Sequence, residues 1–288
     1  MDEQSTAYQE NQPWLQIGMN GRFFANNWRP ARQEIAFAQQ AGFRALQFAV
    51  RNEGLTPTKL GDDFATVAQL LRAAGLTAVM EIVVGIDSTG HNGAGQTPLA
   101  VLEANLPAIT ALPCYAVHWH LILHEPLASA AVRTLEERLQ PQLAAGVALA
   151  QQHGFRFGLE HNEPDLLLFG NPAACYTALE ATPGLHFVWD LNHTTPEHLA
   201  DFLALTPRMS MLHVSDTPLP EVNYHFPIGE GTIDFAAYLA ALQQRGFHGP
   251  AILEIGGQPK SGGFGRDTDA ALITSLQRLV AVRELVIQ

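Results

Sequence analysis

The chain has 288 residues, of which 47% are apolar, and its 28 acidic residues outnumber its 16 Lys and Arg, giving a formal net charge of −12. This apolar share is enough for a large buried core, and the length fits one α/β barrel. The scarcity of basic residues argues against a protein that grips a phosphate backbone, so we expect no nucleic-acid partner.

The N-terminal segment and the two cysteines bear on the cellular compartment in which the protein is expected. Residues 1–13, MDEQSTAYQENQP, are polar and lack the apolar stretch of a signal peptide, so we expect a flexible tail. Cys114 and Cys175 form no C-x-x-C pair, and a reducing compartment is the default for such a chain. No apolar run reaches the length of a membrane span. We therefore predict a cytoplasmic protein without a membrane partner.

One phrase recurs along the chain: an Ala-, Gln- and Leu-rich run, then Gly, one large apolar residue and a short run of Val, Ile, Leu and Phe. The glycine suits the left-handed residue that closes a helix. The short apolar run is typical of a strand that is buried on both faces. The phrase reads QQAGFRALQFAV, LRAAGLTAVMEIVV, QQHGFRFGLEHN, ATPGLHFVWDLNH and QQRGFHGPAILEI.

In chain order, strands are predicted near residues 14–19, 44–50, 77–84, 116–123, 155–161, 186–191, 208–214 and 251–255. Predicted helices include 30–41, 62–74, 131–153, 234–245 and a brief one near 196–205. Eight βα units of this spacing match a (β/α)8 TIM barrel, and no linker divides the chain, so residues 14–288 are predicted to be one domain. The alternative is an open doubly wound sheet. Such a sheet normally has a Gly-rich phosphate-binding turn after its first strand, and the segment GMNGRFF at that place matches this turn poorly.

Carboxylates and a histidine lie where these strands end, which is where an α/β barrel carries its chemistry. Glu160, Asp190, His213 and Glu254 belong to the fifth to eighth predicted strands. A carboxylate in a buried strand is costly unless it is paired or bound to a cation. Three carboxylates and one imidazole suit a hard or borderline ion. We therefore predict that these four residues hold one divalent ion, Mn, Co, Zn or Mg.

The order of the motifs resembles the xylose isomerase-like TIM barrel superfamily, which includes sugar phosphate isomerases and epimerases and the family 2 AP endonucleases of the endonuclease IV type. The motifs are Glu160, DLNH at 190–193, HVSD at 213–216, HFPIGEGTID at 225–234 and Glu254. The resemblance implies a (β/α)8 barrel with the same four metal ligands. It also implies that Glu160 and Glu254 act as acid and base on opposite sides of a bound sugar.

Five further polar residues are predicted to bind substrate: His124, His193, His225, Asp216 and Arg266. Histidines that titrate near neutral pH can bind hydroxyl groups or shuttle protons. Two Gly-rich segments, 85–98 and 256–269, are predicted to cover the cleft. His118 and His120 lie earlier on the fourth strand, and we expect both to be structural. The Gly-Glu-Gly turn lacks the spacing of a phosphate loop, so it is expected to lead into a helix that Thr232 or Asp234 caps.

These residues predict a divalent-metal-dependent isomerase or epimerase of a sugar or sugar-like polyol. The ion polarises a substrate carbonyl, and Glu160 or Glu254 moves a proton at the adjacent carbon through an enediolate. The expected partner is therefore a small carbohydrate-like substrate. Self-association into a homo-oligomer is left open.

Three alternatives remain. The same metal and base could serve a dehydratase or lyase acting on a cyclic hydroxy acid. An endonuclease IV-type phosphodiesterase needs three zinc ions, but the third strand, MEIVVGID, lacks the histidine of that family, and Asn223 stands where it has an aspartate. A non-catalytic relative would have little reason to keep all four metal ligands.

Overall fold

The computed structural model describes residues 13–257 and 259–287, so of the predicted tail over residues 1–13 only Pro13 is described. Eight parallel strands close into a barrel in chain order, with β1 paired to both β2 and β8. The predicted (β/α)8 barrel is therefore confirmed. The strands are β1 (Leu15–Asn20), β2 (Ala45–Arg51), β3 (Thr77–Ile86), β4 (Ala116–Leu123), β5 (Arg156–Glu160), β6 (His186–Asp190), β7 (Met209–Val214) and β8 (Gly249–Leu253).

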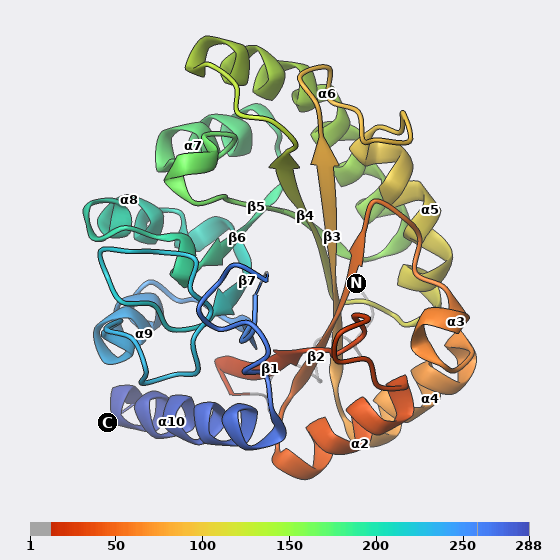
Figure 1. Ribbon diagram of the computed structural model, residues 1–288, viewed down its shortest axis with the longest axis vertical. Helices are drawn as coiled ribbons and strands as arrows, with labels where there is room; N and C mark the ends of the chain where they lie inside the picture. The colour runs from red at the N-terminus through yellow and green to blue at the C-terminus, as the bar shows by residue number, and fades with distance from the viewer. Residues whose placement is uncertain (1–12, 258, 288) are drawn as a thin grey trace.

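Helices surround the barrel on its outside (Figure 1). They are α2 (Ala31–Ala41), α3 (Pro57–Leu60), α4 (Phe64–Ala74), α5 (Pro98–Ala111), α6 (Ser129–His153), α7 (Pro172–Ala181), α8 (Leu199–Ala204), α9 (Phe235–Gln244) and α10 (Asp269–Ile287). The short interval between β6 and β7 holds only a brief helix, as predicted. Among the described helices, none combines the length and the apolar character needed to cross a membrane.

Gly42, Gly75 and Gly154 end their helices as predicted, and Gly246 directly follows the last turn of α9, whereas Gly184 lies two residues beyond Thr182, where α7 ends. All five have a positive φ: Gly42, Gly75, Gly154, Gly184 and Gly246. At Gly42 the φ is 96°, and its N–H bonds to the carbonyl groups of Ala38 and Gln39, which closes α2. A side chain would be strained in this left-handed region, so glycine lets the chain turn at once into the next strand.

The barrel interior is built in two layers. The apolar layer, nearer the N-terminal ends of the strands, consists of Ala45, Val79, Ala116, Val188, Met211 and Ile252. Because side chains alternate along a strand, the residue two positions further on also faces inward. These next residues form the polar layer: Gln47, Glu81, His118, Asp190, His213 and Glu254. On β5, Gly158 is followed in the same way by Glu160.

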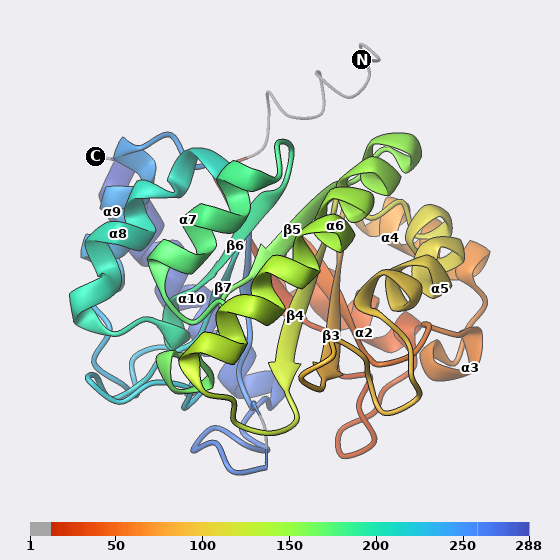
Figure 2. The ribbon, with the colours of Figure 1, turned by 90° about the horizontal axis from the view of Figure 1, so that it is seen from above.

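The other face of each strand packs on the helices, with large side chains such as Trp119, Trp189 and Phe157 fully buried. In Figure 2 the arrowheads of β3 and β4 point to the same side of the barrel, where the loops that follow the strands project. The polar layer lies toward that side. The fold thus closes one end of the barrel with apolar side chains and leaves polar groups at the other.

Gly146 sets how closely α6 approaches the barrel. A Cβ at this position would lie 2.5 Å from Cε1 of the buried Phe157 ring. We expect Gly146→Ala to lower the free energy of unfolding by about 1–3 kcal/mol, because overpacking outweighs a helix-propensity gain of roughly 1 kcal/mol. Urea denaturation measures this change. Adding Phe157→Leu should restore part of the loss, and a single variant as stable as the parent would contradict the packing argument.

Candidate metal centre

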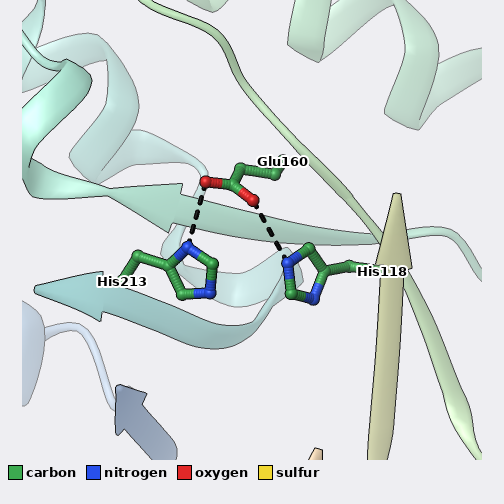
Figure 3. Close-up of side chains that lie close together, drawn as sticks. All are labelled: His118, Glu160 and His213. Carbon is green, nitrogen blue, oxygen red and sulfur yellow. Dashed lines mark hydrogen bonds and ion pairs between the residues drawn. The ribbon is translucent and has the colours of Figure 1, made fainter. Parts of the chain in front are cut away.

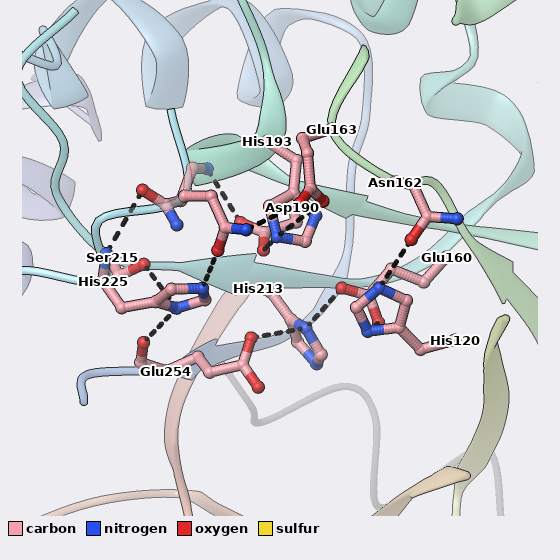
Figure 4. Close-up of polar contacts among 12 residues, drawn as sticks. His120, Glu160, Asn162, Glu163, Asp190, His193, His213, Ser215, His225 and Glu254 are labelled. Atoms are coloured by element: carbon pink, nitrogen blue, oxygen red, sulfur yellow. Dashed lines mark hydrogen bonds and ion pairs between the residues drawn. The ribbon is translucent and has the colours of Figure 1, made fainter. Parts of the chain in front are cut away.

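The four predicted ligands meet at one point in the polar layer (Figure 4). One ligand atom of each of Glu160, Asp190, His213 and Glu254 lies within 4.8 Å of the others. His213 Nδ1 lies 3.0 Å from Glu160 Oε1 and 3.1 Å from Glu254 Oε2. The side chains of Glu160, Asp190 and His213 are fully buried, whereas that of Glu254 is 15% exposed. The arrangement is a buried cluster with one open edge.

The strand register pairs only two of these residues directly. Asp190 on β6 pairs with His213 on β7, and Glu160 on β5 pairs with His120 on β4. Residues paired across parallel strands face the same side of the sheet. Glu254 directly follows β8, and its N–H still bonds to the carbonyl of Val214 on β7. Glu160 pairs with Val188 and His213 with Ile252, so Asp190 and Glu254 each lie two residues beyond the directly paired position. The stagger between tilted strands of a barrel, together with a register shift in the β6–β7 pair between Phe187 and Val188, brings the predicted ligands together.

The donor set fits a divalent cation. Glu160 Oε2 and Asp190 Oδ2 are buried and lack a hydrogen-bond partner among the described residues. His118 Nε2 lies 3.1 Å from that glutamate oxygen (Figure 3), but not in hydrogen-bonding geometry. Buried carboxylate oxygens without partners are costly. An ion bound by three carboxylates and one imidazole would satisfy both oxygens, and Mn, Co, Zn and Mg accept such ligands.

Opposite charges within the cluster shift the pKa values of its members. Burial lowers the pKa of His213, but Glu160 and Glu254 outweigh it and raise that pKa well above its usual value. Burial raises the pKa of Glu254, but the His213 charge outweighs it and brings it down to about 2. For Asp190 the effect of burial is larger than that of the nearby His193 charge, so its pKa is raised. Without a cation, a proton on His213 therefore partly neutralises the carboxylates.

His120 places a further positive charge beside Glu160. Its Nδ1 lies 3.3 Å from Glu81 Oε1 and 3.6 Å from Glu160 Oε2, and its Nε2 lies 2.9 Å from Asn162 Oδ1. The Asn162 amide nitrogen donates to two backbone carbonyl groups, so its oxygen must accept. Burial lowers the pKa of His120, but Glu160 and Glu81 outweigh it and raise that pKa to about 10. Both ring nitrogens thus carry protons.

The cavity above the cluster has a volume of about 640 Å³. Glu254, His120, His193 and His225 line it, together with residues of the predicted covering segment 256–269. The other predicted covering segment, 85–98, contributes no lining residue. The open edge at Glu254 is therefore where a small molecule would meet the cluster.

Two predicted substrate-binding histidines lie at this cavity. His193 Nε2 is 3.2 Å from Asp190 Oδ2, and its Nδ1 is 3.2 Å from the carbonyl oxygen of His161. His225 Nδ1 donates to the backbone carbonyl of Glu254 at 2.9 Å. Both rings stand beside metal ligands and reach the cavity, so their contact with substrate remains a prediction that their positions support.

Asp216, also predicted to bind substrate, is engaged with the backbone instead. Its carboxylate accepts N–H groups from Thr217 at 2.9 Å, Gly229 at 2.7 Å and Ile233 at 3.2 Å. The side chain is buried and does not line the cavity. It holds the loop between β7 and α9, whose helix is capped by Asp234 as expected.

His124 and Arg266 also lie off the cavity. His124 follows β4, is exposed, and lays its ring against the backbone of Gly85. Arg266 pairs with Glu230 and stacks 5.3 Å above the Phe226 ring. Their positions do not support the predicted contacts with substrate, because each side chain is either past the barrel or already paired.

Three inward-facing residues near the cluster were not predicted as site residues: Gln47, Glu81 and His120. Each lies on a strand at an even spacing from a residue of the apolar layer: Ala45, Val79 and Ala116. The alternation of side chains along a strand was therefore the signal that identifies them. His124 has the same parity, but it lies beyond the end of β4 and is exposed, whereas His120 lies within the strand and lines the cavity.

The chain belongs to the xylose isomerase-like TIM barrel family, whose model matches residues 35–279. Among solved structures, it is similar to D-allulose 3-epimerase from Methylomonas sp., with a TM-score of 0.70, 18% identity, and coverage of 93% of this chain and 98% of that one. For an L-ribulose 3-epimerase the TM-score is 0.70, with 16% identity and coverage of 94% and 95%. For a family 2 AP endonuclease from Brucella melitensis the TM-score is 0.65, with 18% identity and coverage of 89% and 97%.

At these identities the solved structures show a shared fold. No curated protein sequence matches the chain.

Cation binding is expected to strengthen as pH rises. His213, with its raised pKa, holds a proton at neutral pH that a cation must displace, so the apparent affinity should increase by up to about tenfold per pH unit. Isothermal titration with Mn²⁺ over roughly pH 6–8 measures the slope. Buffers of different ionisation enthalpy report the released proton. An affinity that is flat or falls with pH would contradict this reading of the site.

Proposed function

We propose that the protein is a divalent-metal-dependent isomerase or epimerase of a small sugar or sugar-like polyol. The convergence of Glu160, Asp190, His213 and Glu254 within 4.8 Å, beneath a cavity of about 640 Å³, carries this proposal. The family membership and the similarity in fold to a D-allulose 3-epimerase and an L-ribulose 3-epimerase support it. The pairing of a metal centre with two glutamates suits proton transfer next to a carbonyl group.

A cation held by these four residues would act as a Lewis acid that draws electrons from substrate oxygens and makes the neighbouring C–H more acidic. Of the two glutamates among the predicted ligands, Glu254 is the better placed to take that proton, because it lines the cavity and Glu160 does not. Asn20 donates to its Oε1 at 3.3 Å and holds the carboxylate in position. With a pKa of about 2 it is ionised at neutral pH.

Glu160 is the partner for the reverse step. It lies across His213 from Glu254, since His213 Nδ1 is 3.0 Å from one carboxylate and 3.1 Å from the other. Two carboxylates on opposite sides of one point can remove a proton from one face of a substrate and return one to the other. His193 and His225, at the cavity wall, are placed to bind substrate hydroxyl groups.

A phosphodiesterase of the endonuclease IV type is less well supported. Asn223, at the position of that family's aspartate, is already engaged: its oxygen lies 2.8 Å from His225 Nε2 and its nitrogen donates to Glu163 at 2.8 Å. The third strand supplies Glu81, whose carboxylate lies beside Gln47 and His120. Groups engaged in this way are poor starting points for additional metal sites.

Glu254→Gln tests the proposal. The amide keeps the shape of the side chain but cannot accept the proton, so turnover should fall by at least about 10²-fold while the fold is retained. The assay incubates Mn²⁺-loaded protein with a panel of ketoses and aldoses in D2O and measures deuterium next to the carbonyl by NMR. Glu230 is an exposed glutamate that pairs with Arg266, and the matched control variant Glu230→Gln should stay active.

Assays of the same metal-loaded protein with other substrates separate the alternative functions. Loss of water with formation of an absorbing enone or aromatic product would identify a dehydratase. Cleavage of abasic DNA, strongest with three zinc ions per chain, would identify a nuclease. A Glu254→Gln variant with parental activity would remove this residue from the acid–base pair.

A further inference from the structure

A chain of hydrogen bonds crosses the barrel interior and ends at the metal ligand His213. His213 Nε2 lies 2.9 Å from Gln47 Oε1, and Gln47 Nε2 donates to Glu81 Oε2 at 3.2 Å. The other oxygen of Glu81 lies 3.3 Å from His120 Nδ1. Neither Gln47 nor Glu81 is a metal ligand or an acid–base residue in the proposed function. Their hydrogen-bonded chain to His213 therefore needs its own explanation.

Glu81 determines the direction of this chain. An ionised carboxylate only accepts hydrogen bonds, whereas an amide offers one accepting and one donating end. The Gln47 amide must therefore turn its NH2 group toward Glu81 and its oxygen toward His213. The opposite orientation would set two oxygens against each other at Glu81 and leave the amide protons facing the imidazole.

The Gln47 orientation in turn fixes the ring of His213. Because Gln47 presents an oxygen, the facing Nε2 of His213 must carry a proton. A neutral imidazole with a proton on Nε2 has its lone pair on Nδ1, which lies 3.0 Å from Glu160 Oε1 and 3.1 Å from Glu254 Oε2. The chain thus aims the lone pair of His213 at the point where the carboxylates converge.

Burial disfavours any other orientation of these hydrogen bonds. Gln47 and His213 are fully buried, and Glu81 is 3% exposed. A buried polar group whose partner is removed bears its full desolvation cost, so the alternatives are disfavoured. The three residues come from β2, β3 and β7, so the contact also ties opposite walls of the barrel together.

We propose that Gln47 is a positioning residue for the metal ligand His213, and that Glu81 sets the direction of its amide. The effect on cation affinity rests on the proposed function. The hydrogen bond from His213 to Gln47 does not, because it needs no cation to form.

The first test compares two Gln→Met variants. Gln47→Met keeps the length of the side chain but removes the acceptor, so the Kd for Mn²⁺ should rise about 10- to 100-fold, as for other groups that hold a metal-binding histidine. Gln16→Met is the matched control on β1. Gln16 is half-buried, and among the described residues its side chain bonds only to Thr77, so the Kd of this variant should stay within about twofold of the parent. Glu81→Gln, which can donate as well as accept, should weaken binding by a smaller factor than Gln47→Met.

The second test observes the ring directly. In ¹⁵N-histidine spectra, His213 of the Zn²⁺-loaded protein should carry its proton on Nε2 alone. In the metal-free parent, that Nε2–H should exchange slowly with solvent, and Gln47→Met should make the exchange faster. Circular dichroism confirms that each variant is folded.

The outcomes are distinct. An unchanged Kd in folded Gln47→Met, an equal loss in Gln16→Met, or a proton on Nδ1 in the zinc-loaded parent would overturn the inference. A parent protein that binds neither Mn²⁺ nor Zn²⁺ would overturn the proposed function instead. In that event the exchange of the Nε2–H, compared between the metal-free parent and metal-free Gln47→Met, needs no ion and would still decide whether Gln47 holds His213.

Discussion

The structure depends on how the closed barrel accommodates charge. Alternation along each strand sends every second side chain into a narrow interior, where water is excluded and an unpaired charge is costly. The apolar layer fills that interior near the N-terminal ends of the strands, and two residues further on the inward positions become polar. Once carboxylates occupy that second layer, every other group near them has to supply hydrogens or positive charge. The candidate site is the result of that requirement.

The positive charge comes from fixed and exchangeable sources. His120 is fixed, because Glu81 and Asn162 accept from its two nitrogens and leave it no neutral form that satisfies both. His213 is exchangeable, because its Nδ1 faces two carboxylates at the point where a cation would bind. A proton and a divalent ion therefore compete for the same place. This competition links the burial of the carboxylates to both metal binding and pH.

The strands and the convergence of the four predicted ligands could be foreseen from local sequence, because each of these residues ends or directly follows an apolar run bounded by glycine or polar residues. Asp216 and Arg266 could not be placed in this way. Their partners, among them Gly229 for one and Glu230 for the other, come from a loop whose path depends on tertiary contacts. His120 was not predicted as a site residue because the last residues of the strand were expected to reach the cleft, whereas an inward-facing position within β4 reaches it in the structure. His124 comes later in the chain, but only His120 faces the interior.

The same hydrogen bonds favour the proposal of a single cation over several, although Asp190, His193 and His225 also lie close enough together to share an ion. In nuclease-type relatives the resemblance implies further ligands on the third strand and near His225. Here Glu81 accepts from Gln47 and lies beside His120, while Asn223 lies between His225 and Glu163. The polar atoms of each of these side chains are therefore already bonded to other protein groups and are not free to bind an ion. A buried group whose hydrogen bonds are complete gains little from a metal. A cation would therefore gain most from Glu160 and Asp190, each of which has one oxygen without a hydrogen bond among the described residues.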